Sequence, residues 1–98
     1  MVRLSEEAIQ AGLLAARKLR DGELPTEAEL ASAPVLNGWI LVEDPGEIVR
    51  LGGFVSGHPI LADGWIWTSI LLFMEPNRQW ARTVSRLYRL GDLGDAPC

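Results

Sequence analysis

The chain has 98 residues, of which 48% are hydrophobic and 22% are charged, and its formal net charge is −4. This length and composition indicate one globular domain and exclude a largely disordered chain. The negative charge argues against a general nucleic-acid binder, which usually has a basic surface. One Cys and one His exclude an internal disulfide and a structural zinc site, so we expect no metal and no cofactor.

The sequence contains no repeat or linker, and we expect a single domain over 1–98, with a helical part at about 5–33, a sheet at about 38–90 and a frayed tail at 91–98. The N-terminal residues hold no apolar run typical of a signal peptide. The longest apolar stretch is far too short to span a bilayer. We therefore expect a cytoplasmic protein that has no membrane partner.

Two helices are indicated in the first third of the chain. Ser5 can cap a helix that begins with an acidic turn, and Gly22 can end it in the left-handed conformation, which predicts a helix at about 6–20. The sequence Thr-Glu-Ala-Glu from Thr26 fits a capping box. It predicts a second, short helix at about 27–32.

Apolar runs separated by turn residues follow the helices. They predict four strands, at about 39–42, 47–57, 65–74 and 80–90. The short connections favour antiparallel neighbours, because parallel strands need longer crossovers. The predicted fold class is therefore α+β, in which two N-terminal helices are followed by a four-stranded antiparallel meander and pack on one of its faces.

Short motifs run through the sheet region: Gly38-Trp39, Ser56-Gly57-His58-Pro59, Asp63-Gly64, Thr68-Ser69 and the segment from Trp80 to Gly91. The last segment is the most specific. Together they resemble a family of small uncharacterised proteins, domains of unknown function found mostly in alphaproteobacteria and their mobile elements. The resemblance implies a bacterial or phage-borne setting, and it supplies no activity and no catalytic residues.

Four acidic side chains gather around one predicted turn and the loop that follows the next strand: Glu43, Asp44, Glu47 and Asp63. Such a surface can bind a basic protein face or mimic phosphates, and the alternative is a solvated rim. Because no catalytic constellation is present, we expect a non-enzymatic interaction module. Its partner would be a larger basic protein or nucleoprotein complex, and one version is a phage or mobile-element inhibitor of the anti-CRISPR type.

A second hypothesis is a nucleic-acid or nucleotide binder that uses a sheet face with Arg50, Arg82, Arg86, Trp65, Trp67 and His58. On one continuous strand, Arg82 and Arg86 would lie about 13 Å apart on the same face. They could hold phosphates, or they could pair with Glu43, Glu47 or Glu75. Trp65 and Trp67 also share a face, where they stack bases, anchor a partner or pack in the core.

A third hypothesis is a small hydrolase in which His58 acts as a general base with Asp63 and a Ser. The alternative is that His58 hydrogen-bonds the backbone of its own loop and that Asp63 only forms a turn. The oligomeric state is left open by the sequence.

Overall fold

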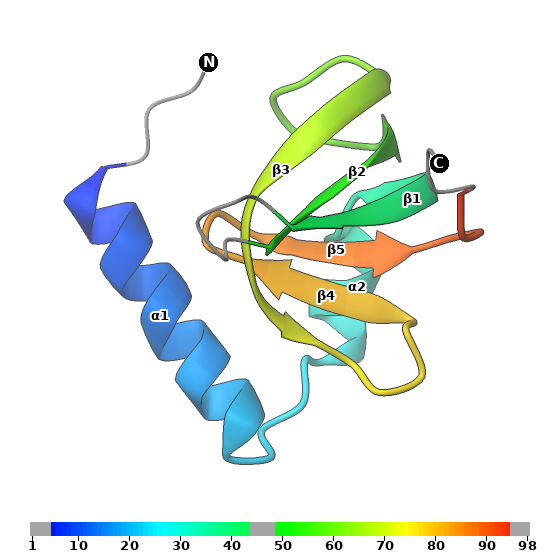
Figure 1. Ribbon diagram of the computed structural model, residues 1–98. Helices are drawn as coiled ribbons and strands as arrows, with labels where there is room; N and C mark the ends of the chain where they lie inside the picture. Colours follow the sequence, from blue (N-terminus) through cyan, green and yellow to red (C-terminus); the bar gives the residue numbers. More distant parts are fainter. Residues whose placement is uncertain (1–4, 44–48, 95–98) are drawn as a thin grey trace.

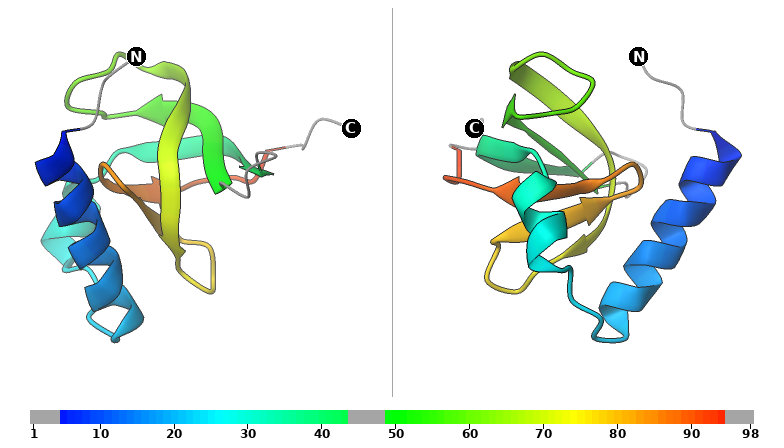
Figure 2. Two further views of the ribbon diagram at one scale, coloured as in Figure 1. Left: turned by 60° about the vertical axis from the view of Figure 1, so that its left-hand side comes forward. Right: turned by 180° about the vertical axis from the view of Figure 1, so that it is seen from behind.

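The structure is a computed structural model that describes residues 5–43 and 49–94. It is a closed β-barrel of five strands, with one long and one short helix on the outside (Figure 1; Figure 2). In chain order the elements are α1 (Glu6–Arg20), α2 (Glu27–Ser32), β1 (Val35–Glu43), β2 (Val49–Ser56), β3 (Gly64–Met74), β4 (Trp80–Thr83) and β5 (Leu87–Leu90).

The predicted fold class is wrong, because the sheet closes on itself. Consecutive strands pair antiparallel, but the predicted strand at 80–90 is two strands, β4 and β5. β5 then pairs in parallel with β1, through Val35 opposite Arg89 and Leu36 opposite Leu90. The first and last of five strands in a meander run in the same direction, which is why the closing pair is parallel. The molecule is a mixed barrel rather than an open sheet with one covered face.

The turn between β4 and β5 contains no Gly, Pro or Asn. Hydroxyl groups replace them: the Thr83 N–H and Oγ1 both donate to the Arg86 carbonyl, at 2.9 and 3.1 Å. The Ser85 N–H donates to Ser69 Oγ at 3.1 Å, which ties the turn to β3. Serine and threonine side chains can bond nearby backbone in this way and so compete with regular strand pairing. The sequence signal for this turn is consequently weak.

Both helices span the predicted ranges. Ser5 Oγ accepts from the Ala8 N–H at 3.1 Å, and Thr26 and Glu29 form the predicted capping box on α2. α1 packs on β3 and β4, and α2 on β5. No helix in the described ranges is both long and apolar enough to cross a membrane.

α1 approaches the barrel through its smallest residues, because Gly12 and Ala16 are its buried positions. A Cβ atom at Gly12 would overlap the Val84 carbonyl oxygen and lie 2.9 Å from the Val84 carbonyl carbon. The backbone of α1 therefore rests directly on the β4–β5 turn. Leu13 and Leu14 are 48% and 56% exposed, so the helix buries little of its bulky apolar surface.

The barrel interior holds the core, whose buried members are Leu36, Trp39, Leu51, Val55, Ala81, Tyr88 and Leu90. The segment after β5 also belongs to this structure. The Trp39 N–H donates to the Asp92 carbonyl at 3.2 Å, and the Gly94 N–H donates to the Trp39 carbonyl at 2.7 Å. Residues 91–94 are thus bound to β1 rather than frayed, and the rest of the predicted tail, 95–98, lies outside the described residues.

Candidate functional site

Three large aromatic side chains are exposed on the outer wall of the barrel, and we call them the aromatic patch: Phe54 (57% exposed), Trp65 (42%) and Trp67 (54%). β2 and β3 position them. In this antiparallel pair Phe54 lies opposite Trp65, and Gly52 lies opposite Trp67. Side chains alternate between the two faces of a strand, so these four positions share the outer face.

The rings of the aromatic patch support one another. Phe54 and Trp65 meet edge to face with centroids 5.1 Å apart at 80°, and Trp65 and Trp67 do so at 5.8 Å and 86°. A Cβ atom at Gly52 would lie 2.7 Å from the Trp67 ring and 3.0 Å from the Trp65 ring. Both indoles therefore lie against the bare backbone of β2. Edge-to-face pairs of this kind are favourable, so the patch is already ordered before anything binds it.

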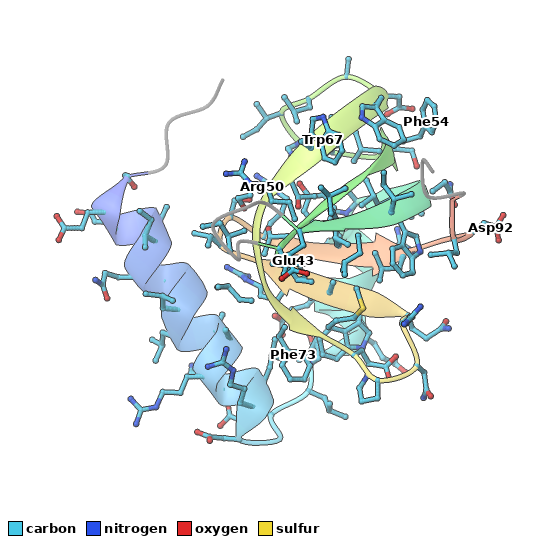
Figure 3. All side chains as sticks on the ribbon, viewed as in Figure 1. Glu43, Arg50, Phe54, Trp67, Phe73 and Asp92 are labelled. Carbon is cyan, nitrogen blue, oxygen red and sulfur yellow. The ribbon has the colours of Figure 1, made fainter. Side chains whose placement is uncertain are left out.

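Arg50 precedes Phe54 by four residues on β2, so alternation places it on the same outer face. Figure 3 shows Phe54 and Trp67 together at one end of the β2–β3 pair and Arg50 nearer α1. The aromatic patch is therefore an apolar surface, and the half-buried Arg50 lies farther along the same wall. The sequence correctly places Trp65 and Trp67 on one face, but Phe54 was missed, since its position opposite Trp65 depends on a register that the sequence does not reveal.

The predicted acidic cluster is not one surface among the described residues. Glu43 is exposed and lies opposite Val49, at the start of β2. Asp63 lies beyond the other end of β2, where its Oδ1 accepts from the Gly57 N–H at 3.3 Å. The length of β2, about 20 Å or more, separates the two. Asp44 and Glu47 lie outside the described residues.

His58 is committed to its own loop. Its Nδ1 accepts from the N–H groups of Ile60 and Leu61, both at 3.0 Å, so the proton of the neutral ring is on Nε2. Burial lowers the pKa of His58, and the positive charge of Arg86 lowers it further. Two serines, Ser69 on β3 and Ser85 in the β4–β5 turn, are hydrogen-bonded to each other at 3.0 Å. This geometry favours the loop-stabilising role over that of a general base.

The β4–β5 turn changes the relation between Arg82 and Arg86. They do not lie along one strand as predicted, because the chain reverses between them and Arg82 pairs with Leu87. Burial lowers the pKa of Arg82, the nearby Arg86 lowers it further, and Glu29 opposes both more weakly. The Arg82 Nε–H donates to the Thr83 carbonyl at 3.0 Å. Glu75, one predicted partner, instead accepts from the N–H groups of Asn77 and Gln79 in its own turn.

Arg82 also lines a groove of about 340 Å³ between α1, the start of α2 and β5. The walls are apolar and polar in similar measure. Leu14, Leu19 and Leu87 are among the apolar residues, and the charged groups are Lys18, Glu23, Glu29 and Arg82. Within the described ranges, no group of three or more His, Cys, Asp or Glu side chains could hold a metal ion. The candidate sites are therefore the aromatic patch and the groove that Arg82 lines.

Comparison with known proteins adds one finding. A model of a protein family matches residues 10–97, which is most of the chain, and the family it describes is one of unknown function. No curated protein and no solved structure matches the chain. The predicted membership of an uncharacterised family is confirmed, whereas the predicted range of organisms is not tested by this match.

Proposed function

The chain belongs to the family of unknown function DUF6634, and from its own geometry we propose that it is a non-enzymatic protein-binding module whose partner docks on the aromatic patch. The observation that carries this proposal is the contiguity of Phe54, Trp65 and Trp67, each more than two-fifths exposed. Single exposed apolar residues are ordinary, but contiguous ones mark interaction surfaces. Tryptophan is also enriched among the residues that dominate binding energy.

The packing of the aromatic patch supports the same proposal. Its rings are held by each other and by the Gly52 backbone, so a partner would not have to order them. Binding costs about 0.5–1.5 kcal/mol for each flexible side chain that it immobilises, and a pre-packed patch avoids most of that cost. A partner with a complementary apolar pocket would therefore gain affinity from a small contact area.

The partner that we propose is a larger protein with a basic rim. The chain's net charge of −4 supports this choice, because opposite charges steer association. An inhibitor of a nucleic-acid-handling complex in a bacterial or phage setting is the narrower form of the proposal. It rests on small size, negative charge and the resemblance noted above, and Glu43 and Asp63 are the members of the predicted acidic set that the structure describes.

The test compares two single substitutions of exposed apolar residues. Tagged wild-type protein, Trp67→Ala and Leu24→Ala are used for capture from nuclease-treated bacterial lysate, and the affinity for the purified partner is then measured by calorimetry. Leu24 is 74% exposed and lies outside the aromatic patch, which makes it the matched control. Loss of a hot-spot residue costs about 2 kcal/mol or more, so Trp67→Ala should weaken binding about 30-fold and Leu24→Ala little. Equal affinities for the two variants would refute docking on the patch.

A second candidate function is binding of single-stranded nucleic acid on the same face. The observation that favours it is that Arg50 lies on the same outer wall of the barrel as two exposed indoles, since bases stack on aromatic rings and phosphates pair with arginine. Salt dependence separates the candidates. Each phosphate contact contributes a slope of about −0.7 to the logarithm of the binding constant against the logarithm of salt concentration. Nuclease-sensitive capture with a steep slope would favour the second candidate.

A further inference from the structure

We propose that the chain forms a dimer in which β3 pairs, along its free edge at residues 64–68, with the same edge of a second copy. The contact would be antiparallel and main chain to main chain, and Ile66 of each copy would lie at its twofold axis. It does not depend on a partner docking on the aromatic patch, so it can be tested separately from the proposed function.

β3 has a strand on each side for only part of its length. β2 pairs with it from Gly64 to Ile70, whereas β4 pairs with it only from Leu71 to Met74. Figure 1 shows β4 beside one half of β3 and no strand beside the other half, from which the N-terminal end of α1 also stands away. Among the described elements, the stretch at 64–68 is therefore an open edge of the sheet.

Two hydrogen bonds show which main-chain groups face this edge. The Leu51 N–H points toward β3, because it donates to Thr68 Oγ1 at 3.1 Å. The Ile70 carbonyl points away from β2, because it accepts from the N–H of Val84, in the β4–β5 turn, at 3.0 Å. Residues of an antiparallel pair alternate between those that exchange N–H···O bonds across the pair and those that do not. The orientation of the other residues follows from this alternation.

The alternation directs the main chain of Trp65 and Trp67 outward. Trp65 lies opposite Phe54, and Trp67 lies opposite Gly52. Both opposing residues are an odd number of positions from Leu51 along β2, so their main-chain groups point away from β3 and make no bond to the tryptophans. The irregularity in this register adds its extra residue to β3, so the count along β2 is continuous. Among the described residues, nothing hydrogen-bonds the outward N–H and carbonyl groups of Trp65 and Trp67.

The open edge lacks the features that usually prevent strands from pairing between molecules. The sequence from Gly64 to Ile70 is Gly-Trp-Ile-Trp-Thr-Ser-Ile, which contains no charged residue and no proline. Charged side chains, proline, a bulge or a covering element normally protect such an edge. The register irregularity comes only after Trp67, beyond the outward tryptophans. An unprotected apolar edge of this kind is expected to pair with another strand.

The outward groups make the edge complementary to itself. When two copies of β3 run antiparallel about Ile66, Trp65 of one copy lies opposite the second copy's Trp67, and the reverse. Both members of each pair point outward, so each pair can exchange two N–H···O bonds. A shift of one residue would instead set an outward tryptophan against Ile66, whose groups point toward β2, and these bonds would be lost. Contacts of this isologous type, with twofold symmetry, are the commonest in soluble homo-oligomers.

The indoles add to this pairing. Directly opposed residues of an antiparallel pair lie on the same face, so Trp65 and the second copy's Trp67 would be neighbours on the outer wall. Aromatic pairs across two strands stabilise a sheet. Trp65 and Trp67 are 42% and 54% exposed in the single chain, so apolar surface is available for this contact. The dimer would also join the aromatic patches of the two copies into one larger surface.

The oligomeric state of the whole chain is the first test. Light scattering after size-exclusion chromatography, run over a range of protein concentrations, should give a mass that rises from one chain to two. Hydrogen exchange at the same concentrations then locates the contact. The amides of Trp65 and Trp67 should be protected only where the dimer is populated, whereas the Ile66 amide, which points toward β2, should be protected throughout. A mass of one chain at every concentration, or exchange at Trp65 and Trp67 that does not depend on concentration, would overturn the proposal.

Substitutions separate the main chain from the side chain. Trp67→Pro and Trp67→Ala both remove the indole, but only the proline removes the outward N–H, and edge strands tolerate proline. Each dimer loses two hydrogen bonds in Trp67→Pro, so its dissociation constant should exceed that of Trp67→Ala at least about tenfold. Equal dissociation constants for these two variants, both shown to be folded by circular dichroism, would contradict the pairing.

A control variant distinguishes the dimer from the proposed function. Phe54→Ala removes a ring of the aromatic patch from β2, outside the open edge. It should leave the dissociation constant of the dimer unchanged while weakening the binding of a partner protein that docks on the patch. A loss of the dimer in Phe54→Ala as large as that in Trp67→Pro would show that the patch, and not the edge of β3, forms the contact.

Discussion

Replacing Gly12 with Ala should destabilise the protein, although Ala is the better helix former by about 1 kcal/mol. The added methyl group would overlap the Val84 carbonyl oxygen and lie 2.9 Å from its carbon. Val84 cannot move away easily, because its N–H donates to the Ile70 carbonyl at 3.0 Å and the turn is hydrogen-bonded on both sides of it. α1 must therefore shift outward, which also uncovers Ala16, now 2% exposed.

Overpacking against Val84 lowers the free energy of unfolding, and the higher helix propensity of Ala raises it. The sign of the measured change therefore shows which of the two dominates. Overpacking against fixed atoms costs about 1–3 kcal/mol, and the lost burial of a methyl group adds about 0.8 kcal/mol. After the gain in helix propensity of about 1 kcal/mol, the net loss should be about 1–3 kcal/mol. For a domain of this size each kcal/mol corresponds to a shift of about 4–8 °C in the unfolding temperature.

The assay is urea unfolding followed by tryptophan fluorescence, with Gln10→Ala as the control. Gln10 is exposed on the same helix, so this variant should be stabilised slightly by helix propensity alone. A rise in the unfolding midpoint of Gly12→Ala, parallel to that of Gln10→Ala, would show that α1 does not rest on the turn as described.

Three further substitutions follow from the hydrogen bonds. His58→Asn should reduce the loss of stability below about pH 6.5. The Asn Oδ1 can accept the same two N–H bonds without titrating. In the wild type the pKa of His58 is lowered in the folded state, so the unfolded chain takes up the proton first as the pH falls and is thereby favoured. Identical acid sensitivity in wild type and variant would contradict this. Ser69→Ala should cost about 1–3 kcal/mol in urea unfolding, because it deprives the Ser85 N–H of its acceptor, and an unchanged midpoint would argue against that bond. Trp39→Phe removes the Nε1–H bond to the Gly91 carbonyl at 3.1 Å and should speed hydrogen exchange at the Gly94 amide. An exchange rate equal to that of the wild type would contradict this prediction.

The parts of the fold that could be predicted are those determined by neighbouring residues. The bounds of both helices follow from caps at Ser5 and Thr26, which act within one helical turn. Closure of the barrel depends instead on Val35 meeting Arg89, far away along the chain. It also depends on a turn held by the hydroxyls of Thr83 and Ser69 rather than by Gly, Pro or Asn. Neither condition leaves a local pattern.

The candidate site was predictable to a similar degree. Alternation places Trp65 and Trp67 on one face, but both faces of β3 are apolar in sequence, so alternation alone cannot say which face is inside. The inner face of β3 includes Ile66 and Leu71, packed against the core, and this leaves the indoles outside. Arg82 and Arg86 were placed too far apart for the same reason that the fold class was wrong: the turn between them was missed.

The closing pair of strands has a consequence for how the chain folds. β1 and β5 are the first and last strands along the chain, and they pair with each other. The segment at 91–94 is hydrogen-bonded to Trp39 in the middle of β1. The hairpins β1–β2 and β2–β3 can form early from nearby residues, because closing a short loop loses little chain entropy. Their inner faces stay open to water until Leu87–Leu90 arrives. The barrel should consequently assemble in one cooperative step governed by its last strand, so that a chain ending before Leu87 would leave Leu36 and Leu51 without their cover.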